Sequence, residues 1–222
     1  MLNRIHVIGS GRVGSAIAAR LLERGVAVDG DDPELVLLCV PDSAIAAVAA
    51  SVSPGPWVAH VSGATPLAAL APHARRCSVH PLQTFTRGRG GEQLDGAWAA
   101  VTAETEEARA AGRSLAAMLG LRPFDLADSA RTLYHAGAVF ASNYVVTLQR
   151  AASLLFESAG AQPEALEPLM RRTIENGFEL TGPISRGDWE TVAAHRAAIQ
   201  EHRAELDHLY ETLAGATLAL AT

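Results

Sequence analysis

The 222-residue chain contains no lysine, so all 18 of its basic side chains are arginines. A mechanism that needs lysine as acid or base is therefore excluded. Proton transfer near neutral pH would fall to one of the eight histidines, whose ordinary pKa is about 6.5. Aromatic residues make up only 5% of the chain although 49% of it is hydrophobic, so alanine, valine and leucine must build its core.

Long basic and long apolar runs are also missing. No basic run exceeds an arginine pair and the formal net charge is −6, which argues against a nucleic-acid surface. No apolar stretch approaches the roughly 20 residues of a membrane-spanning helix. The first predicted strand begins within a few residues of Met1, which leaves no room for a signal peptide. We therefore expect a cytoplasmic protein with no membrane or nucleic-acid partner.

Cysteine is scarce. Cys39 and Cys77 both lie in apolar, strand-like runs, where free buried thiols are expected rather than a disulfide. No metal site is predicted.

The first half of the chain alternates between two patterns. Strand-like runs occupy residues 5–9, 26–28, 35–40, 57–62, 77–80 and 97–103, and helical patterns occupy 11–24, about 42–52 and 104–119. The run 35–40 is apolar almost throughout, as expected of a parallel strand that is covered on both faces. Residues 1–126 are therefore predicted to form an α/β, doubly wound, mainly parallel Rossmann-like domain.

Residues 127–222 show helical patterns alone and predict an all-helical substrate and dimerisation domain. The pattern over 129–159 would make one helix of roughly 45 Å at about 1.5 Å per residue. Further helices are expected at 163–180, 188–204 and 205–221. The apolar faces of the long helix and of the last segment predict a homodimer through this domain.

A glycine motif joins the first predicted strand to the first helix. Gly9, Gly11 and Gly14 have the spacing G-x-G-x-x-G, in which the glycines permit a tight turn, close approach of a pyrophosphate and close helix packing. The helix N-terminus offers unpaired N–H groups and the positive end of its dipole. The predicted cofactor-binding residues of this turn are Gly9, Ser10, Gly11, Arg12, Val13 and Gly14. Arg12 could equally point to solvent, and a turn without a ligand is the alternative.

Polar or turn-forming residues follow three other predicted strands. They are Val40-Pro41-Asp42, Ser62-Gly63 and His80-Pro81. Ligands of parallel sheets bind beyond the carboxyl ends of the strands, so Ser62 and His80 should face the same crevice as the glycines. Simpler interpretations are an N-cap for Asp42 or Ser43, which we favour, an ordinary turn at Ser62-Gly63, and a structural histidine at His80.

Together these stretches resemble the 6-phosphogluconate dehydrogenase-like superfamily. They read GSGRVGSAIA, LLCVPDSAI, HVSGA, HPLQTF, YHAGAVFASNY and LTGPISRGD. Within it the chain is similar to Rossmann-like proteins with a C-terminal helical domain of unknown function, related in plan to prephenate dehydrogenases, ketopantoate reductases and deazaflavin-dependent NADP reductases. The resemblance implies a nicotinamide dinucleotide, NAD or NADP, and no particular substrate.

The resemblance also implies residue roles. Val40 and Pro41 would border the cofactor, and Ser62, Gly63 and His80 would lie near the nicotinamide and the substrate. The long helix would direct His135, Ser142 and Asn143 at the hydride acceptor, with Ser142 as a substrate-binding residue. Many superfamily members carry a catalytic lysine four residues before an asparagine on this helix, and the corresponding residue here is Val139. The predicted catalytic residues are therefore His80, His135 and Asn143, although His135 could equally be a surface histidine.

Arg186 follows Gly182-Pro183, which should end one helix, and precedes Asp188, which should cap the next. These structural roles leave Arg186 unexplained. A guanidinium beside a cleft can bind a carboxylate or phosphate through two hydrogen bonds. Arg186 is thus predicted to bind an acidic substrate, with a surface or interface arginine as the alternative.

The segment after the second predicted strand is unusually short. Only residues 29–34 precede the third strand, too few for the helix and strand that complete a dinucleotide-binding half. Asp29 stands about 20 residues beyond the glycines, where an acid binds the ribose of NAD. With Asp31 and Asp32 it would repel a 2′-phosphate, which favours NAD over NADP. Alternatively the loop is a solvated turn left after loss of the adenosine site.

Two functions fit these observations. The favoured one is an NAD(P)-dependent oxidoreductase that acts on a small, acidic metabolite. The alternative is a non-catalytic Rossmann-like protein that binds a nucleotide or metabolite and has a degenerate adenosine site.

Overall fold

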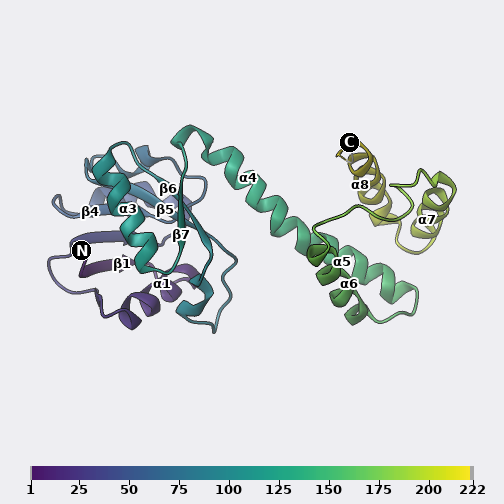
Figure 1. The fold of residues 1–222 in the computed structure, drawn as a ribbon, viewed down its shortest axis with the longest axis horizontal. Coiled ribbons are helices and arrows are strands. Elements are labelled where there is room, and N and C mark those ends of the chain that lie inside the picture. Colours follow the sequence, from purple (N-terminus) through teal and green to yellow (C-terminus); the bar gives the residue numbers. More distant parts are fainter. Residues whose placement is uncertain (1, 221–222) are drawn as a thin grey trace. The chain divides into compact units, whose positions relative to one another are not determined.

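The computed structural model describes residues 2–220 and divides into two compact units, Met1–Phe140 and Ala141–Thr222 (Figure 1). The first unit contains a seven-stranded sheet and the second contains helices. Among the described residues, no helix is both long and apolar enough to cross a membrane.

The sheet has the strand order β2-β1-β3-β4-β5-β6-β7. The strands are β1 (Arg4–Ile8), β2 (Ala27–Val28), β3 (Leu35–Leu38), β4 (Trp57–His60), β5 (Arg76–Leu82), β6 (Trp98–Thr102) and β7 (Arg122–Asp125). All neighbours are parallel except β5 and β6. The predicted α/β fold with a mainly parallel, doubly wound sheet is confirmed.

Hydrophobic cores cover both faces of this sheet. Helices α1 (Arg12–Glu23) and α3 (Glu106–Met118) pack on one face together with Leu35 and Leu37. Helix α2 (Ile45–Ser51) and the short helix η2 (Leu67–Leu70) pack on the other face with Val36 and Leu38. Successive residues of β3 thus enter opposite cores, which explains why its sequence is apolar throughout.

Strand β2 is only two residues long and pairs with Arg4 and Ile5 of β1. Strand β3 begins beside Ile5 on the other side of β1. The chain between them therefore only has to cross β1 near its start, and residues 29–34 do so without a helix or strand. The short connection after the second strand agrees with the prediction, while the strand itself is one residue shorter than the predicted 26–28.

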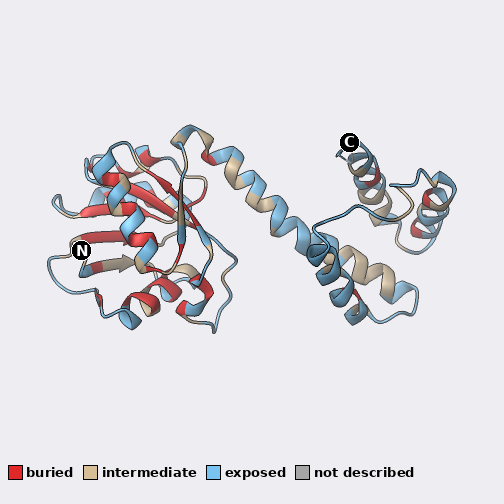
Figure 2. Ribbon diagram, in the orientation of Figure 1, coloured by how far each residue is buried: buried red, intermediate tan, exposed pale blue. Residues whose placement is uncertain are grey.

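The second unit consists of α5 (Asn143–Ser158), α6 (Leu166–Glu175), α7 (Trp189–His202) and α8 (Asp207–Leu220), with short helices η5 (Pro163–Ala165) and η6 (Ala204–Leu206). Buried residues are dense in the first unit and sparse in the second (Figure 2).

The structure corrects three details of the predicted elements. Strand β7 was not predicted, because Pro123 interrupts its pattern. The long helix is divided into α4 (Arg131–Ala141) and α5, because Ser142 has the non-helical angles φ −128° and ψ −70°. Helix α6 ends at Glu175 rather than near residue 180, because Gly177 is left-handed, as at many helix ends.

Both cysteines are free, as predicted. Burial raises the pKa of the Cys39 and Cys77 thiols to about 12, so neither is a reactive thiolate near neutral pH.

Candidate functional site

The carboxyl ends of four parallel strands are aligned. Ile8 of β1 pairs with Leu38 of β3, Leu38 with His60 of β4, and His60 with Ser78 of β5. The glycine turn, Val40, Ser62 and His80 all follow this row closely in sequence. The structure thus brings these predicted site residues to one edge of the sheet, where ligands of such sheets bind.

Two of the three glycines are required by the packing of the turn itself. Gly9 has φ +114°, and a Cβ there would overlap the carbonyl of Cys39. A Cβ on Gly14 would overlap the carbonyl oxygen of Gly9. Gly11 differs, because a Cβ there would have no atom of the described chain within 4 Å. The fold alone therefore does not demand glycine at position 11.

The N-terminus of α1 suits an anion. Its N-cap is Gly11, none of the side chains of residues 2–220 caps it, and its first turn contains no acidic residue. Ser10, Gly11 and Arg12 are exposed. Helix α3 is capped by Thr105 and has two glutamates in its first turn. The residues of the glycine turn thus fit the pyrophosphate of a dinucleotide.

The hydroxyl of Ser62 makes hydrogen bonds within the turn that follows β4. The Oγ of Ser62 accepts hydrogen bonds from the N–H groups of Ala64 and Thr65 and donates to the Oγ1 of Thr65. A Cβ on Gly63 would lie 2.5 Å from Cδ2 of His135 and 2.9 Å from Nε2 of His80. Gly63 therefore permits two predicted catalytic residues to converge, while the Ser62 hydroxyl maintains the turn.

His80 is the central titratable group of this edge. Its Nδ1 lies 2.7 Å from the hydroxyl of Tyr134 on α4, and its ring is 6.0 Å from that of His135. Burial, and then the charges of His135 and Arg131, lower the pKa of His80 to about 4, against a smaller opposite effect of Asp42. Burial raises the pKa of Tyr134 to about 12. Both members of the pair are therefore uncharged at pH 7.

Arg131, at the start of α4, is only 1% exposed, and its charge acts on both His80 and Tyr134. It donates hydrogen bonds to Oγ1 of Thr102, at 2.9 Å, and to the carbonyl of Ser62. Its nearest carboxylate oxygen, on Asp128, is 3.9 Å away, and burial lowers the pKa of Arg131. Burial and then Arg131 lower the pKa of His60 to about 3. The site therefore combines the buried positive charge of Arg131 with two imidazoles, His60 and His80, that are neutral at pH 7.

Arg131 and Tyr134 were not predicted from the sequence. One signal was present, because Arg131 precedes His135 by four residues and so shares its helix face. Nothing local in the sequence indicated that this helix would lie beside β5.

The interpretation of Asp42 or Ser43 as an N-cap is wrong. The short helix η1 (Asp42–Ala44) has Pro41 as its N-cap, α2 has Ala44, and neither receives a side-chain cap hydrogen bond. Asp42 and Pro41 are exposed, and Val40 is half-buried.

Three predicted residues belong to the second unit. Ser142 is the N-cap of α5, Asn143 is its first residue, and Arg186 is exposed in the turn before α7. His135 and Asn143 were expected on one long helix, and the structure instead places them on α4 and α5, which are divided at Ser142. The roles of Ser142, Asn143 and Arg186 stay predictions.

Asp29 lies at the end of β2 with φ +61°. One carboxylate oxygen, Oδ1, accepts the N–H of Val7 at 3.0 Å and lies 3.3 Å from Nδ1 of His6. This carboxylate therefore extends the pairing of β1 where β2 has ended. Its side chain is 55% exposed.

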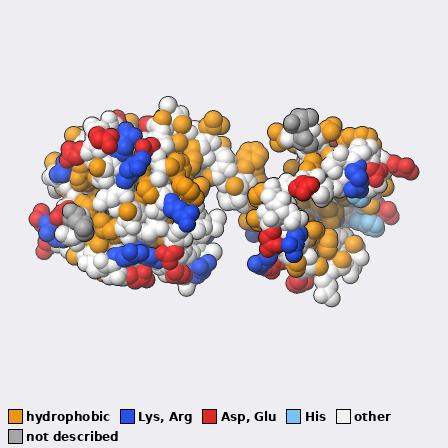
Figure 3. Space-filling model, viewed as in Figure 1, with side chains coloured by type: hydrophobic (Ala, Val, Ile, Leu, Met, Phe, Trp, Pro, Cys, Tyr) orange, Lys and Arg blue, Asp and Glu red, His pale blue; other side chains and the backbone are white. Residues whose placement is uncertain are grey.

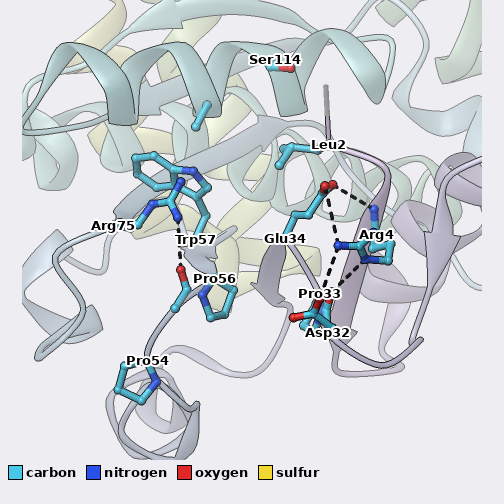
Figure 4. Close-up of a pocket in the computed structure, with 12 residues that line it drawn as sticks. Leu2, Arg4, Asp32, Pro33, Glu34, Pro54, Pro56, Trp57, Arg75 and Ser114 are labelled. Carbon is cyan, nitrogen blue, oxygen red and sulfur yellow. Dashed lines mark hydrogen bonds and ion pairs between the residues drawn. The ribbon is translucent and has the colours of Figure 1, made fainter.

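Asp32 lies at the opposite, amino-terminal edge of the sheet. There a depression of about 560 Å³ includes Arg4, Asp32, Glu34, Trp57 and Arg75 in its lining (Figure 4). Arg4 donates a hydrogen bond to the carbonyl of Asp32, and its guanidinium is 3.5 Å from the Asp32 carboxylate. Arg75 lies over the ring of Trp57. The Asp32 side chain is 94% exposed and pairs with Arg4 at the edge opposite the glycine turn, whereas Asp29 follows β2 at the same edge as that turn.

A family model described as a domain of unknown function, DUF2520, matches residues 97–217. No protein of curated function matches the chain.

Solved structures share the fold over nearly the whole chain. A candidate NADP oxidoreductase from Bacteroides fragilis is 21% identical, with a TM-score of 0.82 and coverage of 98% of both chains. A Thermotoga maritima protein is 23% identical, with a TM-score of 0.77 and coverage of 97% of this chain and 96% of the other. A reductive aminase from Aspergillus terreus, in complex with NADPH and ethyl levulinate, is 16% identical, with a TM-score of 0.68 and coverage of 99% and 94%. These likenesses show the fold and confirm the expected Rossmann-like architecture.

Proposed function

Since the chain belongs to the DUF2520 family and has the fold of proteins described as NADP oxidoreductases, we propose that it is a nicotinamide dinucleotide-dependent oxidoreductase of a small metabolite. The observation that carries the proposal is one shared sheet edge. An uncapped glycine turn and the His80–Tyr134–His135 cluster both lie along it.

In this proposal the turn from Gly9 to Gly14 holds the pyrophosphate, and Val40, Pro41 and Gly63 border the rest of the cofactor. The bound dinucleotide would supply or accept a hydride. His80 would contact the reacting group of the substrate, with His135 beside it. Asn143, Ser142 and Arg186 of the second unit stay proposed substrate-site residues, and Arg186 would bind an acidic group.

One observation favours NAD as the cofactor and another favours NADP. Asp29 stands where an acid binds ribose hydroxyls, which favours NAD. The reductive aminase structure, one of the solved structures with this fold, contains NADPH. We therefore propose a nicotinamide dinucleotide as the cofactor. We also propose that Asp29 determines the preference between NAD and NADP, which can be tested directly.

The second candidate function is a non-catalytic protein that binds a shorter nucleotide or phosphate compound. The six-residue connection between β2 and β3 favours it, because no helix or strand in that connection could cover an adenine ring.

Thermal unfolding separates the two functions. A ligand that binds the folded state at 100 times its Kd stabilises the protein by about 2.7 kcal/mol, which raises Tm by several degrees. We expect such a rise with NADH or NADPH at millimolar concentration. A rise with ADP or pyrophosphate alone would support the non-catalytic alternative, and no rise with any nicotinamide dinucleotide would contradict the oxidoreductase.

A further inference from the structure

The surroundings of His80 determine how it can act. The charged or titratable groups that face it are Asp42 from η1, His60 from β4, and Arg131, Tyr134 and His135 from α4. Asp42 is the one acid in this set, and it is exposed. The buried charge nearby belongs to Arg131, so a second positive charge on His80 would be repelled. The cluster therefore favours an uncharged imidazole.

The hydrogen bond to Tyr134 also selects the tautomer. A neutral imidazole has one N–H donor and one acceptor nitrogen. A phenol hydroxyl is more acidic than a neutral imidazole N–H and is therefore the stronger hydrogen-bond donor, so the favoured arrangement of this 2.7 Å contact has the Tyr134 O–H donating to Nδ1. The remaining proton of His80 then resides on Nε2. That atom lies close to Gly63, because a Cβ on this glycine would be only 2.9 Å from it.

We propose that Tyr134 is a positioning residue that holds His80 as an uncharged Nε2–H donor, so that the site takes a ketone or aldehyde carbonyl in preference to an iminium cation. The substrate assignment rests on the proposed oxidoreductase function. A carbonyl oxygen has lone pairs that accept the Nε2–H bond. An iminium ion has no such lone pair, and its charge would lie near Arg131, where a low local dielectric strengthens the repulsion.

The tautomer can be measured without any substrate. The full chain, labelled with ¹⁵N-histidine, gives ring ¹H–¹⁵N correlation spectra that distinguish the two neutral tautomers from the imidazolium ion. The His80 signals are identified by their loss in His80→Gln. From pH 5.5 to 8 we expect neutral His80 with its proton on Nε2. An imidazolium at pH 6, or a proton on Nδ1, would overturn the proposal.

Tyr134→Phe tests the positioning role while keeping the ring. We expect His80 to change from one tautomer to a mixture, because Nδ1 loses its donor. Tyr210→Phe is the matched control, because Tyr210 makes an equivalent bond of 2.8 Å to Nδ1 of His195 in the second unit. The control should leave the His80 signals unchanged. An unchanged tautomer in Tyr134→Phe would remove Tyr134 from the proposal.

The substrate class has its own test. Cyclopentanone and the N-methyl-1-pyrrolinium ion match in ring size and differ in charge. With NADPH present, we expect cyclopentanone alone to shift the Nε2 resonance of His80. A shift by the iminium alone, or by neither probe, would overturn the carbonyl assignment and leave the tautomer result standing. A parallel NADPH titration monitored by Tm shows whether the cofactor binds. A failure of cofactor binding is thereby distinguished from a failure of the carbonyl assignment and from a failure of the tautomer assignment.

Discussion

Gly11 and Gly14 lack side chains for different physical reasons. Gly14 must be glycine because a Cβ at this position would overlap the backbone of Gly9. A Cβ at Gly11 would instead point into open space. Packing within the fold thus explains the glycine at position 14. Under the proposed function, the close approach of a ligand explains the glycine at position 11.

This difference predicts opposite behaviour of two alanine variants. Gly14→Ala should destabilise the fold by about 3 kcal/mol, because backbone atoms must move. Gly11→Ala should change stability by less than about 1 kcal/mol and weaken NADPH binding at least tenfold. Urea unfolding and cofactor titration measure the two effects. Normal NADPH affinity in Gly11→Ala would contradict a pyrophosphate site at this turn.

Asp29 and Asp32 provide a matched pair for cofactor selectivity. Asn adopts left-handed backbone angles as readily as Asp, so Asp29→Asn removes the charge with little strain. We expect the ratio of NAD to NADP affinity to fall by about tenfold, since one charged hydrogen bond is worth roughly 1.4 kcal/mol or more. Asp32→Asn, at the opposite edge, should not change the ratio. An equal effect of both variants would exclude a specific contact with Asp29.

At the scale of elements, α1 and α3 differ in how their first turns are satisfied. Thr105 accepts a hydrogen bond from Ala108 at the start of α3, and Glu106 and Glu107 complement the helix dipole there. Helix α1 has neither a side-chain cap from the described residues nor an acidic residue in its first turn. An anion at α1 would supply what the side chains supply at α3.

Placing an acid in the first turn of α1 tests this idea. Arg12→Glu should stabilise the free protein by about 0.5 kcal/mol through the helix dipole. It should weaken dinucleotide binding more than tenfold, because it repels the pyrophosphate. Arg12→Gln is the control and should have an intermediate effect. Isothermal titration and Tm measure both quantities, and unchanged affinity in Arg12→Glu would contradict a phosphate at this helix.

The elements with strong local signals were predictable from the sequence. The β1–α1 turn has its glycine spacing, and β3 has an apolar run that is buried on both faces. The interruption at Ser142 and strand β7 were missed, because neither has a strong local pattern. The meeting of Arg131, Tyr134 and His80 depends on contacts between residues about 50 apart in the sequence. Spacing and periodicity cannot reveal such contacts.

At the scale of the whole molecule, the buried histidines predict a loss of stability in mild acid. The pKa of His80 is lowered to about 4 and that of His60 to about 3, against about 6.5 in the unfolded chain. Below pH 6.5 the unfolded state therefore binds more protons, and stability falls as pH falls towards 4. His80 alone contributes roughly 3 kcal/mol to this loss.

Urea unfolding between pH 8 and pH 4 measures that dependence. Stability should be nearly constant above pH 7 and decline below pH 6.5. His80→Gln should decline less steeply. A stability that stays constant down to pH 4.5 would show that these imidazoles are not buried as described.

The second unit has little core of its own. Among its described residues, the buried hydrophobic ones are Leu166, Val192, Ile199 and Ala214, while many large hydrophobic side chains on α5 and α6 are exposed. Hydrophobic atoms are also visible on the surface of this unit in Figure 3. Exposed apolar surface of this extent is typical of an interface, and the proposed homodimer would cover it.

Leu169→Glu tests the dimer. Leu169 is 62% exposed on α6, and Leu22, 60% exposed on α1, is its matched control in the first unit. We expect a homodimer at micromolar concentration that dissociates in Leu169→Glu and persists in Leu22→Glu. Sedimentation velocity distinguishes the species, and a wild-type monomer would contradict the proposal.

The six-residue connection between β2 and β3 affects how fast the proposed cofactor would dissociate. A dinucleotide held mainly by its pyrophosphate would leave its adenine largely in water, so it would forgo much of the apolar burial that slows dissociation. Its residence time would be short, and it would exchange between turnovers. The protein would then use the dinucleotide as a co-substrate, whose supply and redox state in the surrounding solution set the direction of the reaction.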